Sequence, residues 1–174
     1  YTVEQHTSDL YADRAINFLQ TSGKNSEKPF FMFVAFNAPH DPRQSPLEYI
    51  KMYDKNKLEI PKTFLPEHPF NQGDNKIRDE VLCSFPRTEE GVQLHRQEYY
   101  AIISHFDAAV GRIIKALEDM GEMDQTYIIF TSDHGLAIGQ HGLMGKQNQY
   151  DHSIRMPLII SGPGLEKGKQ IDDL

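Results

Sequence analysis

Three short apolar runs constrain the fold of this chain more than any other feature of its sequence. Residues 30–36 read Phe-Phe-Met-Phe-Val-Ala-Phe, residues 126–131 read Thr-Tyr-Ile-Ile-Phe-Thr, and residues 157–162 read Pro-Leu-Ile-Ile-Ser-Gly. Continuous apolar runs of this length are typical of strands that are buried on both faces, as in parallel sheets. The sequence therefore predicts an α/β fold built around three strands.

Two helices are predicted from apolar residues that recur at helical spacing. The first spans residues 8–20, with Ser8 as the expected N-cap, and the second spans residues 92–120, with Gly121 as the residue that ends it. Strand, helix and strand in this order form a βαβ unit, which by default crosses over into a parallel sheet. We expect a single domain in which a mostly parallel sheet is flanked by helices.

The segment between these elements, residues 54–90, holds four prolines and little periodicity. An irregular stretch of this length is too long for a simple connection in a compact domain. We therefore expect an insert that forms the wall of a pocket.

Charge and composition exclude several classes of partner. The chain has 174 residues with 25 acidic and 18 basic side chains, which gives a net charge of -7 and makes binding to nucleic acid or anionic lipid unexpected. No apolar run approaches the ~20 residues that a bilayer span requires. The single cysteine, Cys83, excludes an internal disulfide but fits reducing and oxidising compartments alike, so localisation stays open. An anion site would have to be built locally.

Polar residues follow two of the predicted strands. His40 lies in a loop stiffened by two prolines after the first strand, and Asp133 and His134 follow the second. Ligands of open α/β sheets bind beyond the carboxyl ends of the strands. Carboxylate oxygen and neutral imidazole are compatible metal ligands, although a full shell needs more groups. Asp-His-Gly alone is more often a turn, but its context favours a metal site.

A glycine-rich loop follows this pair and leads to Lys146. Its glycines, at positions 135, 139, 142 and 145, allow the backbone to pass close to a ligand. Lys146 with His40 and a metal would form a cationic pocket suited to a sulfuryl or phosphoryl group, and His40 could act as general acid. His141 could equally line the substrate cleft or hold the glycine loop. Arg43 is expected to be solvated, and His105 to be a structural residue of the long helix.

Four ordered blocks in this chain resemble a known family. Residues 37–42, 130–135, 142–146 and 150–160 are similar to consecutive blocks of the formylglycine-dependent sulfatases of the alkaline-phosphatase-like superfamily, in particular the bacterial arylsulfatase- and choline-sulfatase-like enzymes. The resemblance implies an alkaline-phosphatase-like sandwich and hydrolysis of a small-molecule or carbohydrate sulfate ester.

The resemblance also implies roles for individual residues. Asp133 and His134 match ligands of a divalent metal, usually Ca²⁺, with Mg²⁺ and Mn²⁺ as alternatives. Lys146 matches the lysine that grips the sulfate, and His40 the histidine beside the leaving group. Both are therefore expected to be catalytic and substrate-binding residues, with His141 as a third substrate-binding residue.

The family's nucleophile block is missing from this sequence. Sulfatases carry a Cys/Ser-x-Pro-x-Arg block, whose first residue becomes formylglycine, before everything seen here. Residues 83–87 imitate it, but the proline comes one place late and the block follows His40. We expect Cys83 to be an ordinary loop cysteine. We also expect residues 1–174 to be the central part of a catalytic domain that is inactive alone. The alternatives are a phosphonate monoester hydrolase or phosphodiesterase of the same superfamily, and a non-catalytic truncated domain.

Overall fold

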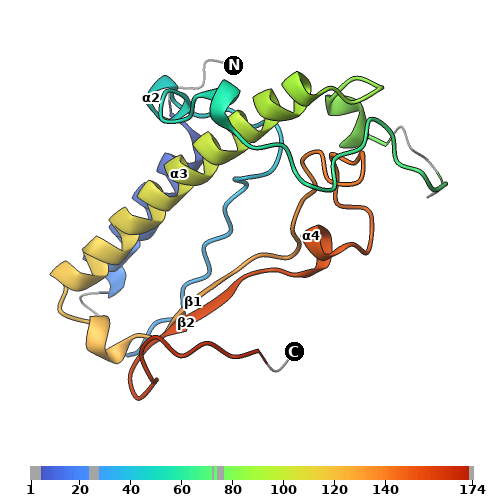
Figure 1. Cartoon of the computed structure of the whole chain (residues 1–174). Helices are drawn as coiled ribbons and strands as arrows, with labels where there is room; N and C mark the ends of the chain where they lie inside the picture. The colour runs from blue at the N-terminus through green and yellow to red at the C-terminus, as the bar shows by residue number, and fades with distance from the viewer. Residues whose placement is uncertain (1–4, 24–27, 72, 74–76, 173–174) are drawn as a thin grey trace.

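A computed structural model of the protein describes residues 5–23, 28–71, 73 and 77–172 (Figure 1). Its helices are α1 (Thr7–Phe18), α2 (Leu47–Ile50), α3 (Glu89–Asp119) and α4 (Asp151–Ile154), and its strands are β1 (Ile128–Thr131) and β2 (Leu158–Ser161). A π-helical turn, η1 (Leu19–Gly23), extends α1, and three 3-10 turns complete the described elements: η2 (Lys55–Lys57), η3 (Glu80–Leu82) and η4 (Met123–Gln125).

The predicted long helix is confirmed as α3. It begins after Thr88, whose hydroxyl accepts a hydrogen bond from the Gly91 backbone N–H, and it ends just before Gly121, which has a φ of 76°. In α1 the expected N-cap is wrong. His6, not Ser8, is the cap, because the Nδ1 of its imidazole accepts a hydrogen bond from the Ser8 N–H. Histidine is an uncommon cap, so the pattern favoured the nearby serine.

Helices α1 and α3 pack side by side and form one layer (Figure 1). Leu19 and Leu117, both almost completely buried, form a cluster with Ala116, and the side chains of Phe30 and Ile128 pack against it. Apolar side chains of the extended segments thus lie under the helix pair, and their burial stabilises this layer at roughly 25 cal/mol per Å² of apolar surface removed from water. The helix-on-strand arrangement confirms the α/β class.

The pairing of the last two predicted strands differs from the prediction. β1 and β2 form an antiparallel ladder in which Ile129 faces Ile160 and Thr131 faces Leu158, so the expected parallel pairing of these two is wrong. A parallel pair needs a crossover, usually a helix, that carries the chain back to the same end. The connection over residues 132–157 contains only the one-turn helix α4, and it reverses the chain instead.

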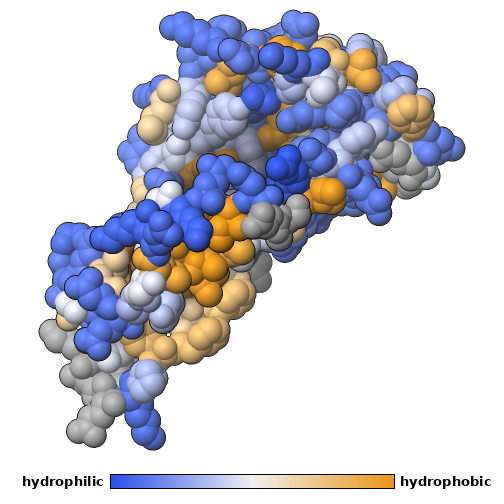
Figure 2. Space-filling model, turned by 60° about the horizontal axis from the view of Figure 1, so that its bottom comes forward, coloured by the Kyte–Doolittle hydropathy of each residue, from blue (hydrophilic) through white to orange (hydrophobic). Residues whose placement is uncertain are grey.

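One face of the extended layer is not covered by the described residues. Residues 30–36 are extended without joining a ladder, and their side chains alternate: Phe31 and Phe33 are 90% and 82% exposed, whereas their neighbours are partly buried. Ile129 and Ile159 are also exposed. Apolar side chains gather into a patch in the space-filling view (Figure 2). Burial on both faces was predicted, and the structure provides burial on one.

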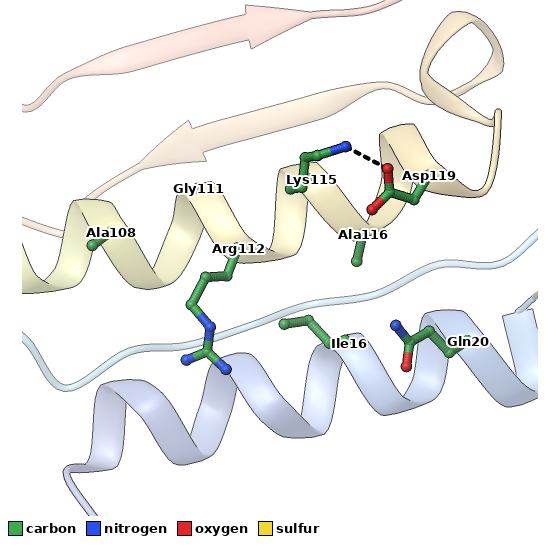
Figure 3. A pocket seen from close by; sticks show the side chains of 8 residues that line it. All are labelled: Ile16, Gln20, Ala108, Gly111, Arg112, Lys115, Ala116 and Asp119. Carbon is green, nitrogen blue, oxygen red and sulfur yellow. Dashed lines mark hydrogen bonds and ion pairs between the residues drawn. The ribbon is translucent and has the colours of Figure 1, made fainter.

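None of the described helices combines the length and apolar character that crossing a bilayer requires. An open groove of about 480 Å³ lies between α1 and α3 (Figure 3). Ile16 and Gly111 line it together with the ion pair of Lys115 and Asp119. It contains none of the polar strand-end residues that the sequence singled out.

Candidate functional site

The loop after β1 and the irregular insert meet near the N-terminal end of α3 (Figure 1). Cys83 from the insert forms a buried cluster with Ile138 and Met144 from the loop, and Tyr99 of α3 packs against it. Cys83 is 6% exposed, which confirms it as a packed structural cysteine. The insert therefore packs against the glycine loop and brings its own polar residues to Lys146, while its predicted role as the wall of a pocket stays a prediction.

Lys146 is held by an aspartate that the sequence did not single out. Its ammonium Nζ lies 3.6 Å from Oδ2 of Asp79, whose side chain is completely buried, while the lysine side chain is 14% exposed. The same carboxylate oxygen accepts a hydrogen bond of 2.9 Å from the Gln147 side chain. Burial raises the pKa of Asp79, but the hydrogen bonds from Gln147 and Arg78 and the charge of Lys146 outweigh it and leave the pKa lowered. Asp79 therefore stays ionised and anchors the lysine.

Arg78 connects this pair to His40. Its Nε donates to Oδ1 of Asp79 at 2.9 Å, and its second guanidinium nitrogen lies 3.1 Å from Nε2 of His40. Nδ1 of His40 lies 3.0 Å from the backbone carbonyl of Asp41, which can only accept, so Nδ1 carries the proton. Arginine can only donate, so Nε2 is the acceptor and His40 is neutral in this arrangement.

A buried ion pair fixes the turn that carries these residues. Glu80 accepts a bond of 2.6 Å from Arg87, and both side chains are almost fully buried. The Glu80 carboxylate also accepts the backbone N–H groups of Met144 and Gly145, at 2.9 and 2.8 Å. Arg87 in turn donates to the backbone carbonyl of Gly142. Two consecutive acidic residues thus hold Lys146. Asp79 contacts its side chain, and Glu80 binds the backbone just before it.

The glycines of the loop approach the protein's own backbone and side chains. A Cβ on Gly142, which has a φ of 76°, would lie 2.6 Å from backbone atoms of residues 67 and 68. A Cβ on Gly145 would lie 2.8 Å from Oε1 of Glu80, and one on Gly135 would lie 2.0 Å from the backbone oxygen of His152. The groups that these glycines approach belong to the insert and to α4, whereas the approach to a ligand that was predicted for them stays a prediction.

Asp133 and His134 lie in an exposed turn at the end of β1. Their side chains are 83% and 38% exposed, and Oδ2 of Asp133 lies 3.4 Å from Nε2 of His134. Nδ1 of His134 faces the Gly135 carbonyl at 2.9 Å, so it carries the proton and leaves the Nε2 lone pair free. Two atoms bound at ~2.4 Å to one cation, about at right angles, would lie ~3.4 Å apart. The pair can therefore share a divalent cation.

The same pair has only local partners. The other Asp133 oxygen accepts from the His134 N–H at 3.0 Å, and Ser132 donates to the His134 carbonyl at 2.8 Å. Burial raises the pKa of Asp133, but the charge that His134 carries when its ring is protonated, together with nearby backbone hydrogen bonds, outweighs it and lowers the pKa overall. Within the described ranges no hydrogen bond or ion pair joins these two side chains to Asp79 or Lys146.

His141 belongs to a histidine-rich layer of four packed rings, which are those of His68, His141, Tyr150 and His152. Its φ is 56°, its N–H donates to the Thr63 carbonyl, and its carbonyl faces Nδ1 of His68 at 2.8 Å. Its ring stacks on that of Tyr150 with the centroids 4.3 Å apart, and the ring of His152 stacks on the same tyrosine at 5.5 Å. These contacts favour the loop-holding role of His141 over a substrate contact, between which the sequence could not choose.

Two other expectations can now be compared with the structure. Arg43 is 7% exposed and not solvated as expected, because it pairs with Asp41 at 3.0 Å and donates to His95. His105 is a buried structural residue of α3, as expected, and its Nε2 forms a hydrogen bond of 3.0 Å with the carboxylate of Asp9. Sequence patterns do not reveal that a loop residue such as Arg43 has a partner as distant in the chain as His95.

A second group of potential metal ligands lies at the start of α1. It consists of His6, Asp9 and His105, whose ligand atoms lie within 4.8 Å of one another. Both ring nitrogens of His6 are already used, one as the α1 cap and one toward the Gln44 carbonyl at 2.7 Å. Asp9 is also paired with Arg112 at 3.2 Å. The hydrogen bonds and ion pairs of this group connect the start of α1 to α3.

The sequence is similar to proteins of a known family. The family described as Sulfatase matches residues 1–174. The chain is 32% identical to arylsulfatase K of Bos taurus over 178 residues, covering 93% of this chain and 32% of that protein. It is 33% identical to choline-sulfatase of Rhizobium meliloti over 179 residues, covering 95% and 35% respectively.

The fold is similar to that of a phosphonate monoester hydrolase of Agrobacterium radiobacter. The TM-score is 0.78 at 27% identity, with 94% of this chain and 34% of that chain covered. The chain thus spans about a third of the length of the proteins that it matches. The structural likeness confirms the alkaline-phosphatase-like fold class expected from the sequence.

Proposed function

The chain belongs to the sulfatase family, and on that premise we propose that it supplies part of the active site of an enzyme that hydrolyses sulfate esters. One observation supports this proposal above the others. Lys146 and His40, 106 positions apart in the sequence, are joined through the ion pairs and hydrogen bonds of Asp79 and Arg78. A cation beside a histidine is the arrangement that a transferring sulfuryl group requires.

Lys146 and Arg78 would attract the sulfate. Both are cations in a chain of net charge -7, and the Lys146 ammonium can donate up to three hydrogen bonds to sulfuryl oxygens. Charge stabilisation of this kind, directed at the oxygens that gain charge in the transition state, often contributes the largest part of catalysis.

Asp133 and His134 would hold a divalent cation, with Ca²⁺ as the ion that the family resemblance implies and Mg²⁺ or Mn²⁺ as alternatives. When bound, such an ion supplies positive charge that stabilises the sulfuryl oxygens. Two ligands do not complete the six to eight oxygen ligands that Ca²⁺ takes, so further ligands would have to come from other residues.

His40 would act beside the leaving oxygen. In the structure its Nε2 accepts from Arg78, so donation from Nε2 requires that Arg78 turns away and that the ring takes up a proton. The Arg78 side chain is 69% exposed, so its second guanidinium nitrogen can leave His40 for a bound anion once it has oriented the ring, while Nε stays bonded to Asp79. The imidazole can then protonate the departing alcohol.

The nucleophile is proposed to come from outside residues 1–174. By the family resemblance it would be a formylglycine, and Cys83 does not replace it because its side chain is buried in an apolar cluster. We therefore expect the chain by itself to be inactive toward sulfate esters, including small-molecule and carbohydrate esters.

A phosphonate monoester hydrolase is the competing activity, and the structural similarity to such an enzyme favours it as the second candidate. The decisive experiment expresses the full-length gene product that includes residues 1–174. It compares kcat/KM for nitrophenyl sulfate, nitrophenyl phosphate and a nitrophenyl phosphonate. We expect preference for the sulfate. A clear preference for either phosphorus substrate would overturn the sulfatase assignment.

A non-catalytic truncated domain is the remaining candidate. Reading the coding sequence before Tyr1 tests it directly. An in-frame Cys/Ser-x-Pro-x-Arg block there agrees with the enzyme, whereas a start codon at this position supports the inert domain.

A further inference from the structure

Asp79 has the most completely buried carboxylate among the described residues around the glycine loop, and it has two hydrogen-bond donors and one ion-pair partner. Arg78 Nε, the Gln147 side-chain amide and Lys146 Nζ lie at 2.9, 2.9 and 3.6 Å from its two oxygens. Removing a carboxylate from water costs several kcal/mol, which must be offset by such partners. An isolated structural ion pair would need only one of them.

The two cations remain accessible although the carboxylate is buried. The Arg78 side chain is 69% exposed and the Lys146 side chain is 14% exposed. Two cations and one carboxylate leave a local charge of +1, so the group still attracts an anion. A lysine side chain is flexible and samples many rotamers unless a partner fixes it. Asp79 therefore restricts the ammonium without cancelling the positive charge of the group.

The backbone beneath these residues is fixed by the neighbouring acid. Glu80 accepts the N–H groups of Met144 and Gly145, the two residues that precede Lys146. Asp79 and Glu80 are thus consecutive residues with distinct targets, one on the side chain of Lys146 and the other on the backbone leading to it. The separation allows the side-chain contact to be tested without removing the backbone contact.

We propose that Asp79 is a positioning residue of this site, which holds Lys146 directly and His40 through Arg78 so that both face the same anion. This inference rests on the proposed function, and it adds to that function a residue outside the blocks that resemble the family. Asp79 touches neither substrate nor reacting atoms in this proposal, and it acts only through its cationic partners.

The first test is a double-mutant cycle on kcat/KM for nitrophenyl sulfate in the full-length gene product. Asp79→Asn preserves shape and removes the charge, and we expect a loss of about 100-fold, as for other misplacements of a reacting group by ~1 Å. In a Lys146→Met background the same substitution should cost only about 10-fold, because the contact with Lys146 is already gone and only the link through Arg78 to His40 remains to be lost. An equal loss in both backgrounds would mean a merely structural role and would overturn the proposal.

A matched control is available in α3. Asp119 also pairs with a lysine, Lys115, but both side chains are exposed. Asp119→Asn should leave kcat/KM unchanged and show no coupling to Lys146→Met.

The second arm tests the link to His40 with a variant that preserves the buried carboxylate. Arg78→Gln changes an exposed side chain, so folding should be retained, and we expect about a 10-fold loss of kcat/KM. The loss should be several-fold smaller in a His40→Asn background, where only the attraction of Arg78 for the anion remains to be lost. If Arg78→Gln remains as costly without His40, this arm of the proposal is wrong.

A measurement without turnover separates failure of this inference from failure of the proposed function. Acetic anhydride labels accessible lysines, and mass spectrometry gives the rate at each one. Lys146 should react several-fold faster in Asp79→Asn, whereas the exposed Lys169 should not change. If the wild type hydrolyses none of the esters, the proposed function fails, and an unchanged labelling rate at Lys146 would then independently overturn the role of Asp79.

Discussion

The two halves of the candidate site are built in different ways. Lys146 is held by residues that lie more than sixty positions away in the sequence and are almost fully buried. Asp133 is exposed and His134 half-buried, and within the part of the chain that the structure describes they bond only to residues within two positions of them. The proposed anion-binding half is therefore organised by this chain itself, whereas the proposed metal-binding half presents ligand atoms that would still require other ligands to complete a cation site.

The largest expected difference between the halves is in stability. Arg87→Met leaves Glu80 buried without its cation, and breaking such a pair costs about 3–5 kcal/mol of unfolding free energy. Asp133→Asn changes an exposed side chain and should cost less than about 0.5 kcal/mol. Urea unfolding of the full-length gene product measures both. Equal losses would show that the anion half is not the better-anchored one.

Glycine substitutions sharpen the same comparison. Gly142 and Gly164 share a φ near 77°, but a Cβ at Gly142 would overlap backbone atoms of the insert, and one at Gly164 meets nothing within 4 Å. Gly164→Ala should cost about 1–2 kcal/mol from the left-handed backbone alone. Gly142→Ala adds overpacking and should cost about 2–5 kcal/mol. Thermal unfolding of both variants measures the difference, and similar losses would contradict the close packing of the loop.

Metal binding should depend only on the half of the candidate site that contains Asp133 and His134. Because only two ligands are present, we expect residues 1–174 to bind Ca²⁺ weakly, with Kd on the order of 1 mM, as in weak extracellular sites. Isothermal titration calorimetry should show this binding abolished in Asp133→Ala and retained in Asp79→Asn. Tight binding that survives Asp133→Ala would refute the assignment of Asp133 and His134.

The smallest expected effect concerns His152 in the histidine-rich layer beside the loop. Burial and the charge of His141 lower the pKa of His152 to about 4, while Asp151 opposes them. The unfolded chain therefore binds more protons between pH 6.5 and pH 4, and stability falls as the pH drops through this window. Melting temperature should fall by a few degrees, and His152→Gln should remove that part of the fall. An identical pH dependence in the variant would contradict the lowered pKa.

The elements that sequence patterns predicted are those fixed by local chemistry. Helix α3, its end at Gly121 and the extended apolar runs depend on periodicity and turn residues within a few positions. The antiparallel pairing of β1 with β2 was missed because run composition does not encode strand direction. The uncovered face at Phe31 and Phe33 was missed because burial depends on what else packs against a strand.

The candidate site was predicted in part for the same reason. His40, Asp133, His134 and Lys146 follow apolar runs or lie in recognisable blocks, so their positions could be read from the sequence. Asp79 lies in an insert without periodicity, and only the fold brings it to Lys146. A buried carboxylate in such a segment carries no local signal.

The most direct test of the central claim is the effect of Lys146 on sulfate-ester turnover in the full-length gene product. Lys146→Met should lower kcat/KM for nitrophenyl sulfate by about 10²–10³-fold, as for the loss of one donor to a developing oxyanion. Lys115→Met, which removes an exposed lysine that is also paired with an aspartate, should change it less than about 2-fold. Equal rates for the two variants would contradict the assignment of Lys146 as the group that holds the sulfate.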